Sequence, residues 1–145
     1  MLNLEQIKEI IPQREPFLFI DEVESIEPGG RVVAIRRVRA DEDWCRGHFP
    51  GEPIMPGVLI IEAMAQTGAV GVLSSPAAKG RNAYFGGIDR AKFRDKVVPG
   101  DVLRLEVELT GIRSRGGKGM ATAYKVLADG SAKVCASCEI TFMFG

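Results

Sequence analysis

The apolar positions of the chain form one long central run with alternating stretches on either side. Residues 58–73 place apolar side chains at almost every angle of a helical wheel, which predicts a buried helix rather than a surface one. Within this run Glu62 and Gln66 lie four residues apart and therefore share one face. We expect the helix to begin with Pro56, whose missing amide donor suits the first helical position, and to end near Ser74.

Before this run, the pattern predicts a short helix and two strands. The helix covers Leu4–Ile11, with Asn3 as its N-cap. A strand is expected from Phe17 to Ile26 and a second one over Arg31–Ala40. Pro28-Gly29-Gly30 between them indicates a hairpin turn.

After a loop from Ser75 to Arg81, the chain is typical of strands separated by short turns. The turns are expected at Pro99-Gly100, at Asp129-Gly130 and, on a weaker signal, at Gly116-Gly117. This predicts four strands, at residues 82–95, 101–114, 118–128 and 131–143. The fold class is therefore α+β, with an antiparallel sheet of about six strands around one long buried helix and a short N-terminal helix.

Composition and charge restrict the function further. The 145 residues are expected to form one domain over 1–145, and 19 basic side chains balance 19 acidic ones. No net charge attracts the chain to nucleic acid or to a membrane. Glu62 and Gln66 interrupt the apolar run, so it is not a membrane span. The first residues lack the basic region of a signal peptide, and three cysteines suit a reducing compartment, so a cytoplasmic protein is expected.

The residues before and inside the central helix carry candidate acid–base chemistry. His48 is the only histidine, and it lies in a loop rich in proline and glycine. Glu62 is costly inside an apolar helix unless it is paired or has a raised pKa, although it could also simply reach the surface. The free amide of Gly57 at the helix start could hold an oxyanion. The segment thus offers a base, an acid and an oxyanion donor, although a lone histidine is more often structural.

The sequence from His48 to Gln66, HFPGEPIMPGVLIIEAMAQ, resembles the signature of bacterial (3R)-hydroxyacyl-[acyl carrier protein] dehydratases. Residues 85–101 also match this family, whereas residues 11–18 fit more loosely. The family usually has histidine at the position of Gln13 and often tyrosine at that of Glu15. The resemblance implies the hot-dog fold, a role in fatty acid synthesis and a substrate carried on the phosphopantetheine of acyl carrier protein.

The resemblance also implies roles for individual residues. His48 and Glu62 would be catalytic and would face each other across a homodimer interface. Gly57 and Val58 would bind the thioester oxygen, and Gln66 would orient Glu62. Dimers of this family often assemble further as a trimer of dimers. No metal and no other cofactor is implied.

Two further groups of residues are candidates for substrate contacts. An acyl tail needs an apolar tunnel, and candidates for its walls are Phe17, Phe49, Met64, Phe85 and Phe93, each of which could equally be ordinary core packing. A basic run at period two could bind acidic acyl carrier protein near the pocket mouth, or could simply be a solvated face; it comprises Arg90, Lys92, Arg94 and Lys96.

Several alternatives remain at this point. Another hot-dog thioester enzyme, either a thioesterase or an enoyl-CoA hydratase, is the nearest, and a non-catalytic acyl-thioester binding protein is a second. Cys45-x-x-His48 and Cys135-x-x-Cys138 could together supply four zinc ligands. Cys135 and Cys138 are three apart in a predicted strand and should point to opposite faces, so we favour buried thiols.

Overall fold

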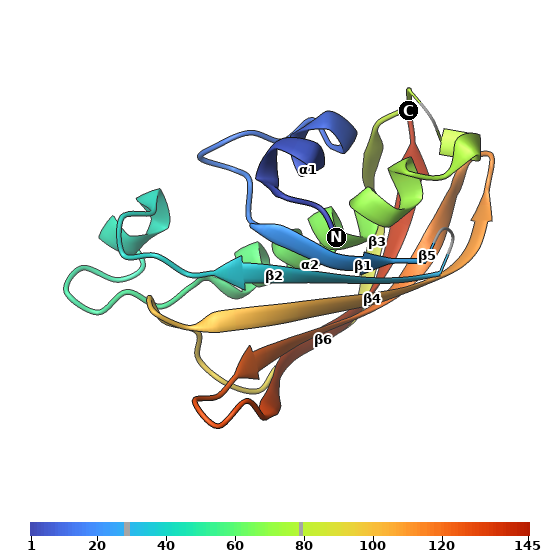
Figure 1. The fold of residues 1–145 in the computed structure, drawn as a ribbon. Coiled ribbons are helices and arrows are strands. Elements are labelled where there is room, and N and C mark those ends of the chain that lie inside the picture. Colours follow the sequence, from blue (N-terminus) through green and yellow to red (C-terminus); the bar gives the residue numbers. More distant parts are fainter. Residues whose placement is uncertain (28–29, 79) are drawn as a thin grey trace.

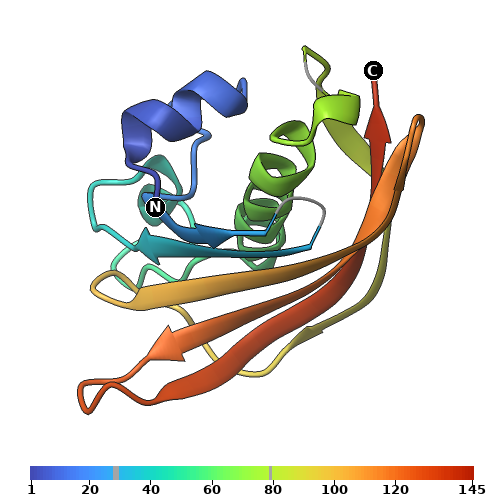
Figure 2. The same ribbon diagram turned by 45° about the vertical axis from the view of Figure 1, so that its right-hand side comes forward.

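The computed structural model describes residues 1–27, 30–78 and 80–145. The predicted antiparallel sheet of about six strands is confirmed: over these residues six strands form one sheet, in the order β1-β2-β4-β5-β6-β3. The strands are β1 (Glu22–Ile26), β2 (Arg31–Arg37), β3 (Ala83–Phe93), β4 (Val102–Arg113), β5 (Gly116–Val126) and β6 (Ala132–Phe144). The sheet curves around the central helix α2 (Gly57–Leu73), which lies along its concave face (Figures 1 and 2).

The predicted burial of α2 is confirmed, because apart from Glu62 every residue from Ile60 to Val72 is buried. Glycines allow this close packing. A Cβ at Gly68 would lie 2.5 Å from the ring of Phe142. These contacts set the spacing between α2 and the sheet, on which the positions of the helix side chains depend.

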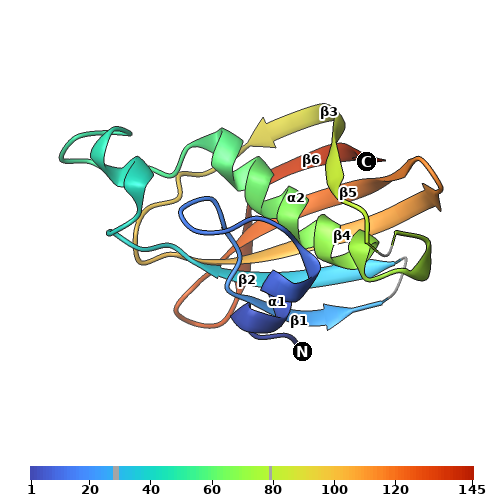
Figure 3. The same cartoon turned by 90° about the horizontal axis from the view of Figure 1, so that it is seen from above.

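The N-terminal helix α1 (Leu4–Ile10) is also confirmed, and it ends one residue before the predicted boundary. The Asn3 side chain accepts a hydrogen bond from the Gln6 amide, and the Gln6 side chain accepts one from the Asn3 amide. Ile7 is fully buried. Seen from above, α1 lies on the β1 side of the sheet, away from α2 at the centre (Figure 3).

Two predictions near α2 were wrong. The strand expected from Phe17 begins only at Glu22, because the backbone of Phe17 and Phe19 bonds the Gln66 side chain rather than a neighbouring strand. The Asp21 amide is the first to bond β2, at the Ile35 carbonyl. Pro56 is the N-cap of α2 with ψ of 138°, so Gly57 is the first helical residue. Both differences arise from side chains and backbone angles that the hydrophobic pattern does not encode.

The Gly116-Gly117 turn was also wrong, since both residues begin β5 and the turn lies at residues 114–115. A Cβ at Gly116 would collide with the Phe142 carbonyl, so this glycine serves close strand packing rather than a turn. β2 ends at Arg37, before the predicted limit of Ala40. The antiparallel pairing of β1 with β2 is confirmed, while Pro28-Gly29 lie outside the described residues.

Two features of the outline matter for the site. The loop between β2 and α2, with the short helix η1 (Asp43–Arg46), projects beyond the body of the sheet (Figures 1 and 3). β3 is the last strand and pairs on one side only, with β6, within the described chain. A second short helix, η2 (Pro76–Ala78), follows α2. Among the described residues, no helix has the length and apolar character needed to cross a membrane.

Candidate active site

The start of α2 presents free backbone donors. Leu59 and Ile60 both donate their amides to the Pro56 carbonyl, at 2.9 and 3.2 Å. The amides of Gly57 and Val58 precede these bonds, in the turn where helical amides have no intrahelical acceptor. Among the described residues no side chain caps this end. The first turn therefore carries the partial positive charge that stabilises an oxyanion.

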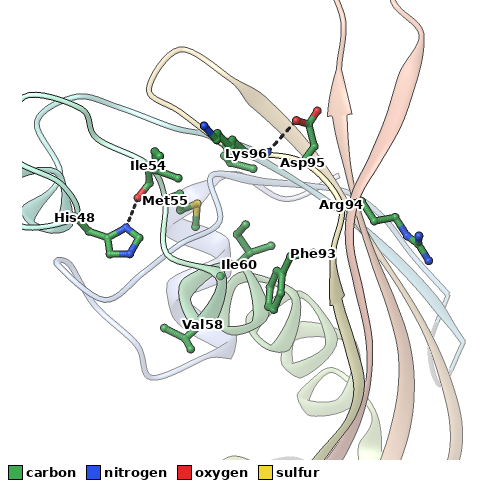
Figure 4. Close-up of a pocket in the computed structure, with 11 residues that line it drawn as sticks. His48, Ile54, Met55, Val58, Ile60, Phe93, Arg94, Asp95 and Lys96 are labelled. Atoms are coloured by element: carbon green, nitrogen blue, oxygen red, sulfur yellow. Dashed lines mark hydrogen bonds between the residues drawn. The ribbon is translucent and has the colours of Figure 1, made fainter.

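Phe93 leaves little room for a side chain at Gly57. A Cβ on this residue would lie 2.8 Å from Cε1 and 2.9 Å from Cζ of Phe93. The ring of Phe93, at the end of β3, therefore rests directly against the backbone of the first helical turn (Figure 4). A ligand that reaches this backbone shares the space with an aromatic ring.

His48 lies between η1 and α2 with its ring orientation fixed. Its Nδ1 is 2.7 Å from the carbonyl oxygen of Ile54 (Figure 4). A carbonyl oxygen only accepts, so Nδ1 carries the proton and Nε2 of the neutral ring keeps a free lone pair. The ring also stacks on Phe49 with a centroid separation of 4.1 Å. His48 is thus held as a base with one available nitrogen.

His48 opens onto a cavity of about 750 Å³ between its loop, the start of α2 and the end of β3. Apolar side chains form most of the wall, including Val58, Ile60 and Phe93 (Figure 4). Lys96 also lines it. A base, a helix start and apolar walls together suit a site that binds a largely apolar ligand through a small number of polar groups.

Glu62 lies one and a half turns further along α2 and faces a second, smaller cavity of about 180 Å³. Burial raises the pKa of the Glu62 carboxyl, and a hydrogen bond from Gln66 acts in the opposite direction. Gln66 Nε2 donates to Glu62 Oε2 at 2.8 Å. The free oxygen, Oε1, is therefore the one able to carry a proton toward the cavity.

Gln66 is fully buried and uses both ends of its amide. Besides Glu62, its Nε2 donates to the Phe17 carbonyl at 2.9 Å, and its Oε1 accepts from the Phe19 amide at 2.8 Å. The segment before β1 therefore fixes Gln66, and Gln66 in turn fixes Glu62.

Within one chain His48 and Glu62 line different cavities. The candidate tunnel residues are divided in the same way. Phe93 lines the His48 cavity and Phe85 lines the Glu62 cavity. Met64 is fully buried in the core.

Two other aromatic candidates lie outside these walls. Phe49 is half-exposed beneath the His48 ring. Phe17 is also half-exposed and meets Phe19 edge to face at 4.9 Å. Neither aromatic ring belongs to the Glu62 cavity.

The basic run is divided between two surfaces. Arg90, Lys92 and Arg94 line a groove formed with β5 and β6, where Arg90 is 3.5 Å from the carboxylate of Glu139. The Arg94 side chain points away from His48 (Figure 4). Arg94 also borders the His48 cavity, and Lys96 lines that cavity alone. The register of β3 shifts between Asp89 and Lys92, which a strict period of two does not anticipate.

Sequence reasoning missed the ion pair that supports the His48 loop. Arg36 and Glu42 have side chains only 2% and 9% exposed, and their charged atoms are 2.6 Å apart. Trp44 Nε1 donates to the same carboxylate, and the Trp44 carbonyl accepts from the His48 amide at 3.0 Å. The guanidinium of Arg36 also lies 5.2 Å from the centre of the Phe19 ring. An arginine in a strand with apolar neighbours was the available signal.

The cysteines do not form a metal site with His48 in the described part of the chain, where no three potential ligands of this kind are grouped. Cys135 and Cys138 are free and buried, as expected, and burial raises the pKa of each thiol to about 11. The argument for opposite faces assumed regular alternation along β6, and that alternation is interrupted at Cys135. The β5–β6 register shifts opposite Cys135, and both side chains are buried.

Comparisons with known proteins show the family of the chain. The family description "FabA-like domain" matches residues 11–137. The 3-hydroxyacyl-[acyl-carrier-protein] dehydratase FabZ of Enterococcus faecalis is 53% identical over 99% of both chains. The protein of the same name from Ligilactobacillus salivarius is 56% identical over the full length of both.

Solved structures show the fold. One chain of a dehydratase heterocomplex, ApeI:P from Xenorhabdus doucetiae, superposes with a TM-score of 0.73 at 15% identity, covering 96% of this chain and 90% of that one. A hypothetical thioesterase with coenzyme A from Streptococcus pneumoniae superposes with a TM-score of 0.63 at 14% identity, covering 86% and 84%. The expected hot-dog fold is therefore confirmed.

Proposed function

The chain belongs to the FabA-like family, and we propose that it dehydrates (3R)-3-hydroxyacyl thioesters on acyl carrier protein in fatty acid biosynthesis. The products are a trans-2-enoyl thioester and water. The observation that supports the assignment is the contrast between two side chains. His48 is fixed with a free Nε2, while burial favours the protonated form of Glu62. A base and an acid are the two groups that removal of water requires.

Each step has a group suited to it. Nε2 of His48 takes the proton from Cα of the substrate. The amides of Gly57 and Val58 hold the thioester oxygen as negative charge develops on it. Glu62 Oε1 gives its proton to the hydroxyl as the Cβ–O bond breaks, so the carbon–carbon double bond and water form together. The chemistry uses no metal and no redox cofactor.

The site is shared between two chains in this proposal. The separate cavities of His48 and Glu62 in one chain support it. So does the unpaired edge of β3, where Tyr84, Phe85 and Ile88 are 57%, 41% and 45% exposed. Antiparallel pairing of two β3 strands would cover these side chains and bring the cavities of the two chains together. A trimer of such dimers is proposed on the resemblance alone.

Acyl carrier protein is the proposed partner. Lys96 is our candidate for the phosphopantetheine phosphate, because it lines the cavity that holds His48, whereas Arg94, which borders the same cavity, points its side chain away from His48 (Figure 4). Arg90, Lys92 and Arg94 form a second basic surface that could meet acidic side chains of the carrier. We propose a cytoplasmic enzyme without nucleic-acid or membrane partners.

The experiment is the reverse reaction, hydration of crotonyl thioesters, followed by loss of enoyl absorbance. Wild type should be active, whereas His48→Ala and Glu62→Gln should each lose about 10²–10⁴ in kcat with unchanged circular dichroism. A folded wild type that is inactive on carrier-protein and CoA thioesters of several lengths would favour a thioesterase or an acyl-binding protein.

Complementation tests the shared site. Mixed dimers of His48→Ala and Glu62→Gln contain one intact site, so activity should return after the subunits exchange. If exchange is demonstrated by mass spectrometry and no activity returns, the two residues do not act across an interface.

A further inference from the structure

The cavity of Glu62 contains a second polar group that the reaction described above does not use. Gln13, on the segment after α1, lines this cavity together with Glu62 and the small side chains of Ala65 and Ala69. Its amide oxygen is buried and meets no hydrogen-bond donor among the described residues. Buried acceptors are nearly always paired. An unpaired acceptor beside a reacting carboxyl therefore indicates that its donor is a group of the substrate or of the product.

The reaction itself supplies such a donor. Glu62 Oε2 is occupied by Gln66 Nε2, so the proton for the leaving hydroxyl comes from Oε1. The departing oxygen thus becomes a water molecule next to Glu62, with two O–H groups. One can donate to the carboxylate just formed, and the other needs a second acceptor. The cavity holds about 180 Å³, which is room for such a molecule at about 30 Å³ per water.

We propose that Gln13 is a positioning residue for this water: its amide oxygen accepts one hydrogen bond from the water that forms at Glu62. In the reverse direction the same bond orients the attacking water. The Cα proton goes to His48, the Glu62 proton goes to the hydroxyl, and Gln13 exchanges no proton. The inference rests on the proposed function.

Other occupants fit the amide oxygen less well. An acyl chain offers no donor, so it would leave the oxygen unpaired and would favour the alanine walls instead. A donor from a partner chain would pair it permanently, and Gln13 would then stabilise the dimer rather than the reaction. These two roles predict opposite effects on stability.

The test compares Gln13→Met, which keeps the length of the side chain without its acceptor, with Gln13→His, which returns a nitrogen acceptor. In crotonyl-thioester hydration, Gln13→Met should lose about tenfold in kcat, with KM for the thioester within twofold of wild type. Its Tm should equal or exceed that of wild type, because an unpaired buried acceptor has been removed. Gln13→His should recover most of the kcat. Glu15→Gln, an exposed change on the same segment, serves as the control and should leave kcat unchanged.

Two results would overturn the inference. One is a kcat for Gln13→Met within twofold of wild type. The other is a lower Tm or a dissociated dimer for Gln13→Met, which would assign Gln13 to the interface. An inactive wild type would instead overturn the proposed function, and with it the role of Gln13, whereas an active wild type with an unaffected Gln13→Met removes only the present inference.

Discussion

Replacing Gln66 by methionine should destabilise the protein more than any ordinary loss of a buried hydrogen bond. The change keeps an unbranched side chain but removes three bonds, to Phe17, Phe19 and Glu62. The Phe19 amide is buried and would lose its acceptor, at a cost of about 1–3 kcal/mol. The other two partners are partly buried and can regain water, at about 0.5–1.5 kcal/mol each. After the gain from a more apolar side chain, we expect a net loss of about 2–5 kcal/mol.

Urea unfolding at a fixed protomer concentration measures this loss. The matched control is Thr67→Val, at the next position of α2, which is also fully buried. It removes one bond to the Ala63 carbonyl, and that carbonyl keeps its helical partner, so about 0.5–1.5 kcal/mol is expected. If Gln66→Met costs no more than the control, the backbone before β1 does not depend on Gln66, and the reasoning fails.

The same variant changes the pH dependence of activity. The bond from Gln66 lowers the pKa of Glu62, so its loss should raise that pKa further. In the proposed mechanism, dehydration requires protonated Glu62 and declines as pH rises through the pKa of this carboxyl. The alkaline limb of kcat/KM should therefore move to higher pH in Gln66→Met. A limb that stays fixed would show that another group controls it.

Three further outcomes are expected. Glu62→Gln should raise Tm at pH 8, because burial raises the pKa of Glu62 in the folded state and the wild type loses stability as pH rises through that pKa. The difference in Tm between variant and wild type should vanish below about pH 4.5, and a difference that stays constant with pH would contradict this. Gly57→Ala should lower kcat about 10–100-fold as its Cβ meets Phe93, and Phe93→Ala in the same chain should restore part of the loss. Gly71→Ala should destabilise the protein by about 1–3 kcal/mol in thermal unfolding, because the new Cβ collides with Val32. This cost should exceed the helix preference of alanine, and a higher Tm would show that Val32 can move to make room.

The elements that the sequence predicted well are those in which one physical cause dominates. The apolar surface of α2 and the alternation of the later strands follow from burial, and both were found within a few residues. The strand predicted over Phe17–Ile20 was wrong because the Phe19 amide bonds the side chain of Gln66, which is 47 residues away in the sequence. No local pattern of apolar residues carries that information.

The residues of the candidate site were also predicted only in part. His48 and Glu62 became candidates because a lone histidine in a Pro/Gly-rich loop and a carboxylate in an apolar helix are unusual. Their catalytic roles were implied by the family resemblance and stay a prediction. Gln13 was noticed only as a departure from a family pattern, since its significance depends on a cavity formed by segments far apart in sequence. The Arg36–Glu42 pair was missed for a different reason: its members are only six residues apart, but the sequence pattern does not show that both side chains are buried.

The free edge of β3 has a consequence for the newly made chain. The half of the strand around Tyr84 and Phe85 exposes apolar side chains, while the half around Arg90 carries charge, and the register shifts once in each half. Charge and bulges discourage indiscriminate strand addition, and an apolar open edge invites it. Newly made chains that have not yet found a second copy would therefore be prone to aggregate or to bind chaperones. Pairing of this edge with a second copy, as proposed above, would cover it and remove the hazard.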